Sequence, residues 1–140
     1  MIRQTGALPW RIGADRKPEI LLVTGKRSSR WIIPKGWPMA GKSLAAAAQI
    51  EAFEEAGVEG KVDPQPLGTL GHIKSTAFGS IRAEITVHAL KVEQELDDWP
   101  EKEERTRRWF PFKEAAAKVR SRELRQLIES LEKRLNAGAG

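Results

Sequence analysis

Three glutamates with helical spacing are the residues of this chain whose types and positions could do chemistry. Glu51, Glu54 and Glu55 lie in the segment GWPMAGKSLAAAAQIEAFEEAGV, residues 36–58. In a helix, the spacing i, i+3 and i+4 gathers the three carboxylates on one face, and Gly57 supplies a helix stop. Negative charges near a helix C-terminus oppose the macrodipole by about 0.3–1 kcal/mol each, so a cation should compensate them. Mg²⁺, a hard ion that takes carboxylate oxygens, is the natural candidate.

The helix that carries these glutamates is predicted to lie between two layers of the fold. Ser43 can act as its N-cap, and the helix is expected to run to about Ala56. Its other sides are rich in alanine, and a helix that is apolar nearly all round is usually buried. The carboxylates are therefore predicted to open into a cleft rather than into bulk solvent.

Strand-like patterns flank this helix on both sides. We predict strands over residues 6–12, 19–24, 31–33, 66–73, 81–92 and 107–110, with an exposed acidic excursion over residues 93–104. Ser121 can cap a C-terminal helix that carries one apolar stripe, and a tail over residues 136–140 is expected to fray. Mixed strands with one internal and one terminal helix predict a single α/β layered domain over residues 1–140.

The composition restricts the class of protein. A chain of 140 residues, 40% hydrophobic and 31% charged, is typical of one globular domain. Because no apolar run approaches the ~20 residues that span a bilayer and no signal-peptide pattern is present, we expect a cytoplasmic protein with no membrane partner. The absence of cysteine excludes disulfides, thiol nucleophiles and thiolate zinc sites. The net charge of +5 fits an anionic partner, and the assembly is expected to be a monomer or a small homo-oligomer.

The segment over residues 36–58 resembles the Nudix box, G-x5-E-x7-R-E-u-x-E-E-x-G-u, in which u is an apolar residue. The matching positions are Gly36, Glu51, Ala52, Glu54, Glu55, Gly57 and Val58. Two positions depart, because Lys42 replaces a Glu and Ile50 replaces an Arg. In the family that Arg helps to orient the first helical Glu, and losing such a support typically costs ~10–100-fold in metal affinity or activity. The resemblance therefore implies a slower enzyme or a changed substrate geometry.

The surrounding residues resemble the diphosphoinositol polyphosphate phosphohydrolase branch of the family. The resemblance covers residues 20–23 with Arg27, residues 30–36, and the later run over residues 97–110; Lys35 departs, since better-known members have Gly there. That branch also acts on dinucleoside polyphosphates, so the implied substrate is a polyphosphorylated small molecule of either type. The implied fold is a Nudix α/β/α sandwich with a mixed β-sheet, an internal box helix and a C-terminal amphipathic helix.

The resemblance also implies a metal site and its catalytic groups. Mg²⁺, or Mn²⁺ in its place, would be held by Glu51, Glu54 and Glu55 and by the backbone carbonyl of Lys35, and metal ions can activate water and neutralise phosphate charge. The glutamate that serves as base varies within the family, so all three stay catalytic candidates, with Glu55 and Glu51 ranked above Glu54.

Basic side chains are the candidates for holding the substrate phosphates, because the arginine fork suits phosphate oxygens. Arg27 and Arg105 match positions that contact substrate phosphates in the resembled branch. The further candidates are Arg30, Lys35, Arg107, Lys74 and Arg3.

Two other functions stay open at this point. The departures at Lys42 and Ile50 favour a non-catalytic or weakly active phospholigand-binding module, and an RNA 5′-end pyrophosphohydrolase would share the same metal chemistry. Residues 105–110 mix arginine with aromatics, as a single-strand RNA surface does, but the run is too short to favour a nucleic-acid partner. His72 and His88 are isolated in the sequence, and structural roles are predicted for both.

Overall fold

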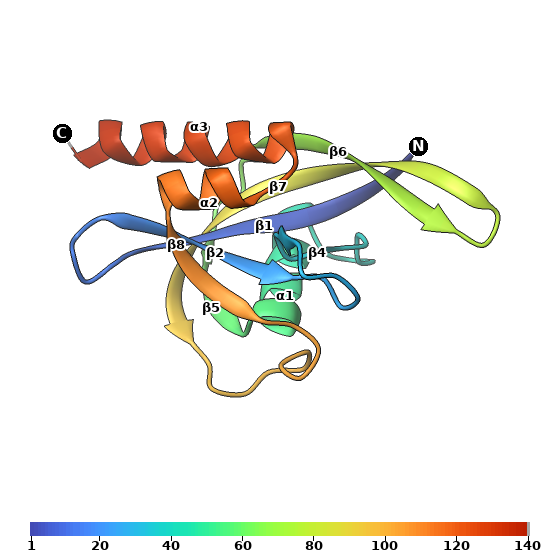
Figure 1. The fold of residues 1–140 in the computed structure, drawn as a ribbon, viewed down its shortest axis with the longest axis horizontal. Coiled ribbons are helices and arrows are strands. Elements are labelled where there is room, and N and C mark those ends of the chain that lie inside the picture. Colours follow the sequence, from blue (N-terminus) through green and yellow to red (C-terminus); the bar gives the residue numbers. More distant parts are fainter. Residues whose placement is uncertain (140) are drawn as a thin grey trace.

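A mixed sheet lies between one helix and a pair of helices in the computed structural model, which describes residues 1–139 (Figure 1). The elements are β1 (Ile2–Ile12), β2 (Pro18–Thr24), β3 (Trp31–Ile32), β4 (Lys35–Gly36), α1 (Leu44–Ala56), β5 (Val58–Val62), β6 (Gly68–Thr76), β7 (Gly79–Glu95), β8 (Arg107–Pro111), α2 (Phe112–Lys118) and α3 (Arg122–Ala139). This arrangement confirms the α/β/α sandwich with a mixed sheet, an internal box helix and a C-terminal helix.

The sheet has the order β3-β2-β1-β7-β5, and β4, β6 and β8 pair with β1, β7 and β2. The central pair, β1 with β7, is parallel from Ile2 opposite Ala83 to Trp10 opposite Lys91, while all the other described pairs are antiparallel. The short strand β4 adds only two residues, Gly36 opposite Thr5 and Lys35 opposite Gly6. This pairing ties the glycine of the box to the middle of the sheet.

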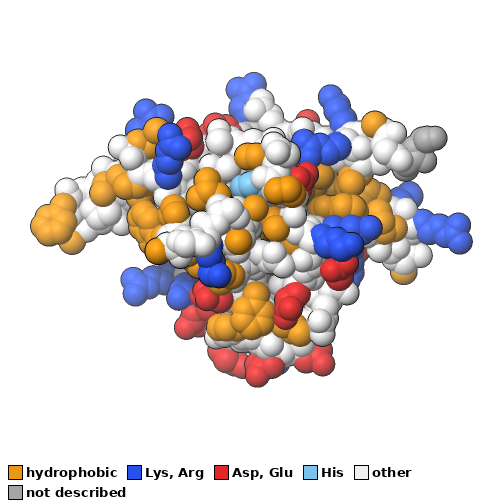
Figure 2. All heavy atoms as spheres, turned by 180° about the vertical axis from the view of Figure 1, so that it is seen from behind, with side chains coloured by type: hydrophobic (Ala, Val, Ile, Leu, Met, Phe, Trp, Pro, Cys, Tyr) orange, Lys and Arg blue, Asp and Glu red, His pale blue; other side chains and the backbone are white. Residues whose placement is uncertain are grey.

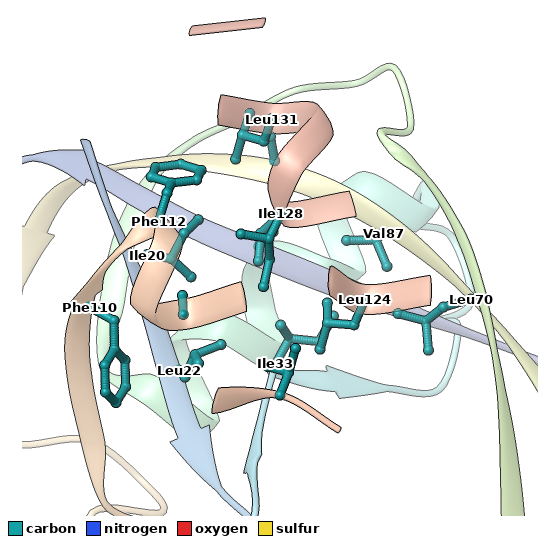
Figure 3. Close-up of a cluster of buried hydrophobic side chains, with 14 of the residues drawn as sticks. Ile20, Leu22, Ile33, Leu70, Val87, Phe110, Phe112, Leu124, Ile128 and Leu131 are labelled. Atoms are coloured by element: carbon teal, nitrogen blue, oxygen red, sulfur yellow. The ribbon is translucent and has the colours of Figure 1, made fainter. Parts of the chain in front are cut away.

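Two hydrophobic clusters lie on the opposite faces of the sheet. Successive strand residues point to opposite faces, so Leu8 and Leu22 belong to one cluster, whereas Ala7 and Leu21 belong to the other. The larger cluster is covered by α2 and α3, and Figure 3 shows Phe112, Ile128 and other side chains gathered over this face. The smaller cluster is covered by α1.

Helix α1 begins and ends where its sequence predicts. The Ser43 side chain accepts a hydrogen bond from the Ala46 N–H at 3.0 Å, as expected for an N-cap. Gly57 has φ of 65°, and its N–H donates to the Phe53 carbonyl, which is the left-handed conformation that glycine adopts at helix ends. The alanine face of α1 packs on the sheet, with Ala52 fully buried.

Other parts of the chain differ from the prediction. The strands β4 and β5 and the helix α2 were not predicted, and β1 begins four residues earlier than the expected residue 6. The acidic excursion is only partly exposed, because β7 continues to Glu95 and the Glu101 N–H donates to the Glu54 carbonyl of α1 at 3.0 Å. Helix α3 reaches Ala139 and Gly140 lies outside the described residues, so fraying of residues 136–140 stays a prediction. Within residues 1–139, no helix combines the length and the apolar character needed to cross a membrane.

Candidate active site

A cavity of about 450 Å³ opens where α1 faces the segment around β4 and the excursion after β7. Two carboxylates of α1, Glu51 and Glu55, line it together with the backbone of β4. The other lining residues are Gln4, Lys26, Trp37, Pro38, Met39, Lys74, Glu101 and Arg105. The cavity therefore places two acidic groups of the box among several basic ones. The sequence analysis predicted that these carboxylates open into a cleft.

Glu55 is the most buried of the three predicted glutamates, with 6% of its surface exposed. Its Oε1 accepts a hydrogen bond from the Lys35 N–H at 3.2 Å, and its Oε2 lies 3.5 Å from Nη2 of Arg105. Burial raises the pKa of Glu55 to about 7, although the Arg105 guanidinium and the Lys35 N–H act in the opposite direction. Glu55 is thus a carboxyl that titrates near neutral pH.

Glu51 lies one helical turn before Glu55, against the backbone of Gly36. A Cβ at position 36 would overlap the Glu51 carboxyl group in its present position, so the carboxyl would have to move to make room for any other residue. Burial, followed by the charge of Glu54, raises the pKa of Glu51, and a hydrogen bond with the Glu55 carboxyl partly offsets this rise. The first glycine and the first helical glutamate of the box are therefore in direct contact.

Glu54 is not among the residues that line the cavity. It is half-buried, and its backbone carbonyl binds the excursion. Among the side chains of residues 1–139, no three from His, Cys, Asp and Glu are grouped closely enough to hold a metal ion together. The structure thus brings Glu51 and Glu55 together in the cavity wall, and the roles predicted for all three glutamates stay predictions.

The groups that line this cavity fit a hard divalent cation. Two carboxylates with raised pKa values are in close contact, and a cation beside them would favour their ionised forms. Gln4, which the sequence analysis did not single out, is 3% exposed, and its Oε1 is buried without a hydrogen-bond partner. Ionised carboxylates and an amide oxygen are the oxygen donors that Mg²⁺ and Ca²⁺ take. The donor set is therefore suitable for a metal ion.

A second cavity, of about 510 Å³, lies beside the first and shares Lys35 with it. Arg27, Arg30 and His72 line it, over apolar residues of both the sheet and α3 that include Leu124. Burial lowers the pKa of Lys35, and the pKa of His72 is lowered by burial and then by the charges of Lys35 and Lys74. Two of the predicted phosphate ligands, Arg27 and Arg30, thus lie together in a cationic environment.

His72 lines this second cavity, although only a structural role was predicted for it. The sequence holds no local signal for this placement, because the residues that line the second cavity with His72 come from distant segments that only folding brings together. His88 is buried, and its Nδ1 lies 2.9 Å from the Asp63 carbonyl, in keeping with the structural role predicted for it.

The remaining basic candidates occupy three different places. Lys74 lines the carboxylate cavity, with its Nζ 5.1 Å from the centre of the half-exposed Trp37 ring. Arg105 lies in the wall of the same cavity, beside Glu55. Arg3 is exposed on β1 and lines neither cavity.

Figure 2 shows acidic side chains gathered along the lower edge of one face of the molecule and basic ones spread above them.

Arg107 binds the end of α1 and lines neither cavity. Its Nη1 donates to the carbonyls of Ala56 and Gly57 at 3.0 and 3.2 Å, and its Nη2 donates to the Leu96 carbonyl at 2.7 Å. Its guanidinium also lies 3.9 Å from the centre of the Trp99 ring. Arg107 therefore supplies part of the cationic compensation that the acidic C-terminus of α1 requires.

Comparisons with known proteins agree with this geometry. The model of the NUDIX domain family matches residues 4–131. Nudix hydrolase 12, mitochondrial, of Arabidopsis thaliana is 32% identical, over 89% of this chain and 70% of that protein. Diphosphoinositol polyphosphate phosphohydrolase 3-beta of Bos taurus is 34% identical, over 73% of this chain and 60% of that protein.

Solved structures share the fold at lower identity. A C. elegans Ap4A hydrolase in a binary complex has a TM-score of 0.73 at 18% identity, over 98% of this chain and 99% of that one. The NUDIX domain of Shewanella oneidensis NrtR, solved with ADP ribose, has a TM-score of 0.72 at 18% identity, over 96% and 88%. This chain belongs to the Nudix family and is a hydrolase of that family, as its box residues predict.

Proposed function

We propose that this chain is a pyrophosphohydrolase that depends on a divalent metal ion and cleaves a phosphoanhydride bond in a polyphosphorylated small molecule. The observation that carries the proposal is the pair of box carboxylates, Glu51 and Glu55, which face basic side chains across one cavity. The substrate is of the diphosphoinositol polyphosphate or dinucleoside polyphosphate type. The names of the bovine relative and of the C. elegans neighbour support these two types.

Glu51, Glu55 and the backbone carbonyl of Lys35 would hold the metal ion, Mg²⁺ or Mn²⁺, with Glu54 as a further ligand. Such an ion, when bound, lowers the pKa of a bound water and neutralises charge on the phosphates. The protein contributes a rigid frame for these groups, because the Lys35 N–H holds Glu55 and the Gly36 backbone leaves room for Glu51.

Glu55 is the first candidate for the general base. In the metal-free protein its pKa is raised to about 7, and a bound cation would favour its ionised form. An ionised Glu55 can take the proton that the attacking water loses. The water oxygen bonds to phosphorus, the bridging P–O bond breaks, and its electron pair leaves on the bridging oxygen. Cationic side chains near that oxygen stabilise the charge that develops there.

Arg27, Arg30 and Lys35 would bind the phosphates that do not react. All three line the second cavity, and Lys35 lines the carboxylate cavity as well. A substrate that spans both cavities would therefore have its anionic part held in one and its scissile bond placed in the other.

The predicted cytoplasmic location and the predicted assembly, a monomer or a small homo-oligomer, stay predictions. The A. thaliana relative is named as mitochondrial.

A substrate panel tests this function. Purified protein is incubated with diphosphoinositol polyphosphates, diadenosine polyphosphates and a 5′-triphosphorylated oligonucleotide, with Mg²⁺, with Mn²⁺ or with EDTA. We expect metal-dependent release of phosphate or nucleotide from at least one small molecule and a loss of roughly 100-fold or more with Glu55→Gln, the scale of general acid–base catalysis.

Three outcomes would contradict the proposal. Stable binding without product would favour the phospholigand-binding module. Turnover of the oligonucleotide alone would favour the RNA 5′-end activity. Turnover that EDTA and Glu55→Gln leave unchanged would mean that the catalytic groups lie elsewhere.

A further inference from the structure

All three nitrogens of the Arg105 guanidinium are engaged by the protein. Nε donates to Glu101 at 2.8 Å, Nη1 donates to the Thr24 carbonyl at 3.0 Å, and Nη2 lies 3.5 Å from Oε2 of Glu55. The Arg105 side chain is only 10% exposed. A guanidinium carries five N–H groups and binds a phosphate in the bidentate way with two of them on one edge. Two N–H groups of Arg105 already donate to the protein, and its Nη2 lies against Glu55, so the protein itself competes with a substrate phosphate for this side chain.

The partners of Arg105 come from three separate parts of the chain. Thr24 ends β2, Glu55 belongs to α1, and Glu101 lies in the excursion after β7. Glu101 also lies 3.7 Å from Nζ of Lys26, so it stands between two cations. Arg105 therefore joins these segments at the point where the Glu55 carboxylate enters the cavity.

The box itself provides no such support for its carboxylates. The position that holds Arg in the Nudix box is Ile50 here, and an isoleucine side chain offers neither charge nor a hydrogen bond. Ile50 and Lys42, the two departures from the box, both line a different cavity of about 420 Å³ that shares no residue with the carboxylate cavity. Cationic support for the box carboxylates must therefore come from outside the box.

We propose that Arg105 is a positioning residue that holds the Glu55 carboxylate in place, and so gives the box carboxylates a cationic support from the end of the excursion, on a different glutamate from the one that an Arg at position 50 would orient. This assignment rests on the proposed function, because Glu55 matters there as a metal ligand and base. It also gives Arg105 a different role from the phosphate contact that the family resemblance implied. Losses of such supports typically reduce metal affinity or activity by ~10–100-fold.

Arg105→Lys is the decisive variant. Lysine keeps the positive charge but replaces the planar fork with a single ammonium group, so the electrostatic effect on a bound cation is largely kept while the three-way contact is lost. We expect Mn²⁺ affinity, measured by calorimetric titration without substrate, to fall by roughly 10-fold, and kcat to fall by at least as much. KM for the best substrate of the panel is expected to stay unchanged.

The opposite split would overturn the assignment. If Arg105 held a substrate phosphate, Arg105→Lys would raise KM and leave Mn²⁺ affinity unchanged. Unchanged Mn²⁺ affinity and kcat would also overturn it. Because the titration needs no substrate, it decides the role of Arg105 even if no member of the panel is cleaved. A panel in which nothing is cleaved would count against the proposed function and not against the role of Arg105.

Two further variants serve as a control and as an independent test. Arg108→Lys is the matched control, since Arg108 is exposed on β8 and lines neither cavity; both measurements should stay at their wild-type values. Glu101→Gln leaves Arg105 in place and weakens its 2.8 Å contact, so it should lower Mn²⁺ affinity in the same direction by a smaller factor. If Arg105→Lys does not fold, judged by its thermal transition, unchanged Mn²⁺ affinity in Glu101→Gln overturns the assignment.

Discussion

Glu55 combines burial with a pKa far above its ordinary value, and this combination makes the stability of the metal-free protein depend on pH. Its pKa is raised from 4.5 to about 7. Between these values the unfolded chain ionises while the folded chain must keep its proton. The folded state therefore loses stability as the pH rises through this window, and the loss is complete above the folded pKa.

We predict that Glu55→Gln removes this pH dependence. Near pH 4, below both pKa values, the variant and the wild type should unfold alike in EDTA, because Glu55 is then largely protonated in the folded and in the unfolded protein. At pH 8 the variant should be more stable by about 1–3 kcal/mol, since glutamine cannot ionise. Chemical unfolding at both pH values measures the difference, and Glu103→Gln, at an exposed position of the excursion, is the control. A gain that is equal at both pH values would assign the effect to packing.

Gln4 is the second residue whose burial points to a ligand. A buried acceptor without a partner costs about 1–3 kcal/mol, so Gln4→Leu, which keeps a similar volume, should raise the unfolding free energy of the ligand-free protein. The same change should lower kcat/KM for the best substrate of the panel, because a polar residue that lines the carboxylate cavity is replaced by an apolar one. Gln126→Leu, on the exposed face of α3, should alter neither quantity. A stable variant with full activity would show that Gln4 has no part in the site.

At the scale of elements, the site depends on how closely β4 approaches α1. The backbone of Gly36 leaves no space for a side chain beside the Glu51 carboxyl. We predict that Gly36→Ala displaces this carboxyl and lowers both Mn²⁺ affinity and kcat by roughly 10-fold or more. Gly138→Ala is the control, because a Cβ there meets nothing within 4 Å. Full Mn²⁺ affinity in Gly36→Ala would mean that Glu51 is not a ligand.

Elements with local start and stop signals could be predicted from the sequence, and those without could not. Ser43 and Gly57 mark the ends of α1 through contacts within a few residues. The helix α2 follows Pro111 and has no side-chain cap, and its local signals are limited to Glu114 in the first turn and Lys118 in the last turn, which did not suffice to predict a helix of seven residues. In β5, Gly60 resembles a turn residue, but it is needed because the backbone of Lys91 in β7 leaves no room for a Cβ there. That reason exists only in the folded sheet.

The same limit applies to the candidate site. The helical spacing of Glu51 and Glu55 was enough to predict that they share a face, and both line the carboxylate cavity. Gln4 and Glu101 lie 47 and 50 residues away from Glu51 along the chain (51 − 4 and 101 − 51), and tertiary pairing alone brings them to the cavity. Arg107 was predicted from its charge to hold phosphate, but whether an arginine meets substrate or a helix end depends on that pairing too.

At the scale of the whole molecule, the proposed function assigns phosphate binding to one cavity and bond cleavage to the other. The first holds the carboxylates, the second holds Arg27 and Arg30, and Lys35 belongs to both. The excess of positive charge is consistent with this proposal, because the net charge is +5 even though the proposed catalytic groups are acidic. A side chain in the second cavity should therefore affect substrate affinity more than the chemical step.

Arg27→Ala tests this division against a matched arginine. Losing one charge-assisted hydrogen bond of about 1.5–3 kcal/mol lowers kcat/KM by roughly 10–100-fold, and we predict that the loss lies in KM while kcat and Mn²⁺ affinity stay near the wild-type values. Arg3→Ala removes the same charge at an exposed position outside both cavities, so it should leave KM unchanged at moderate salt, where charges separated by more than about 10 Å are screened. Equal rises in KM for the two variants would mean that the overall charge, rather than the second cavity, attracts the substrate. A fall in kcat with Arg27→Ala would place Arg27 beside the reacting phosphate, and the two cavities would then act as one site.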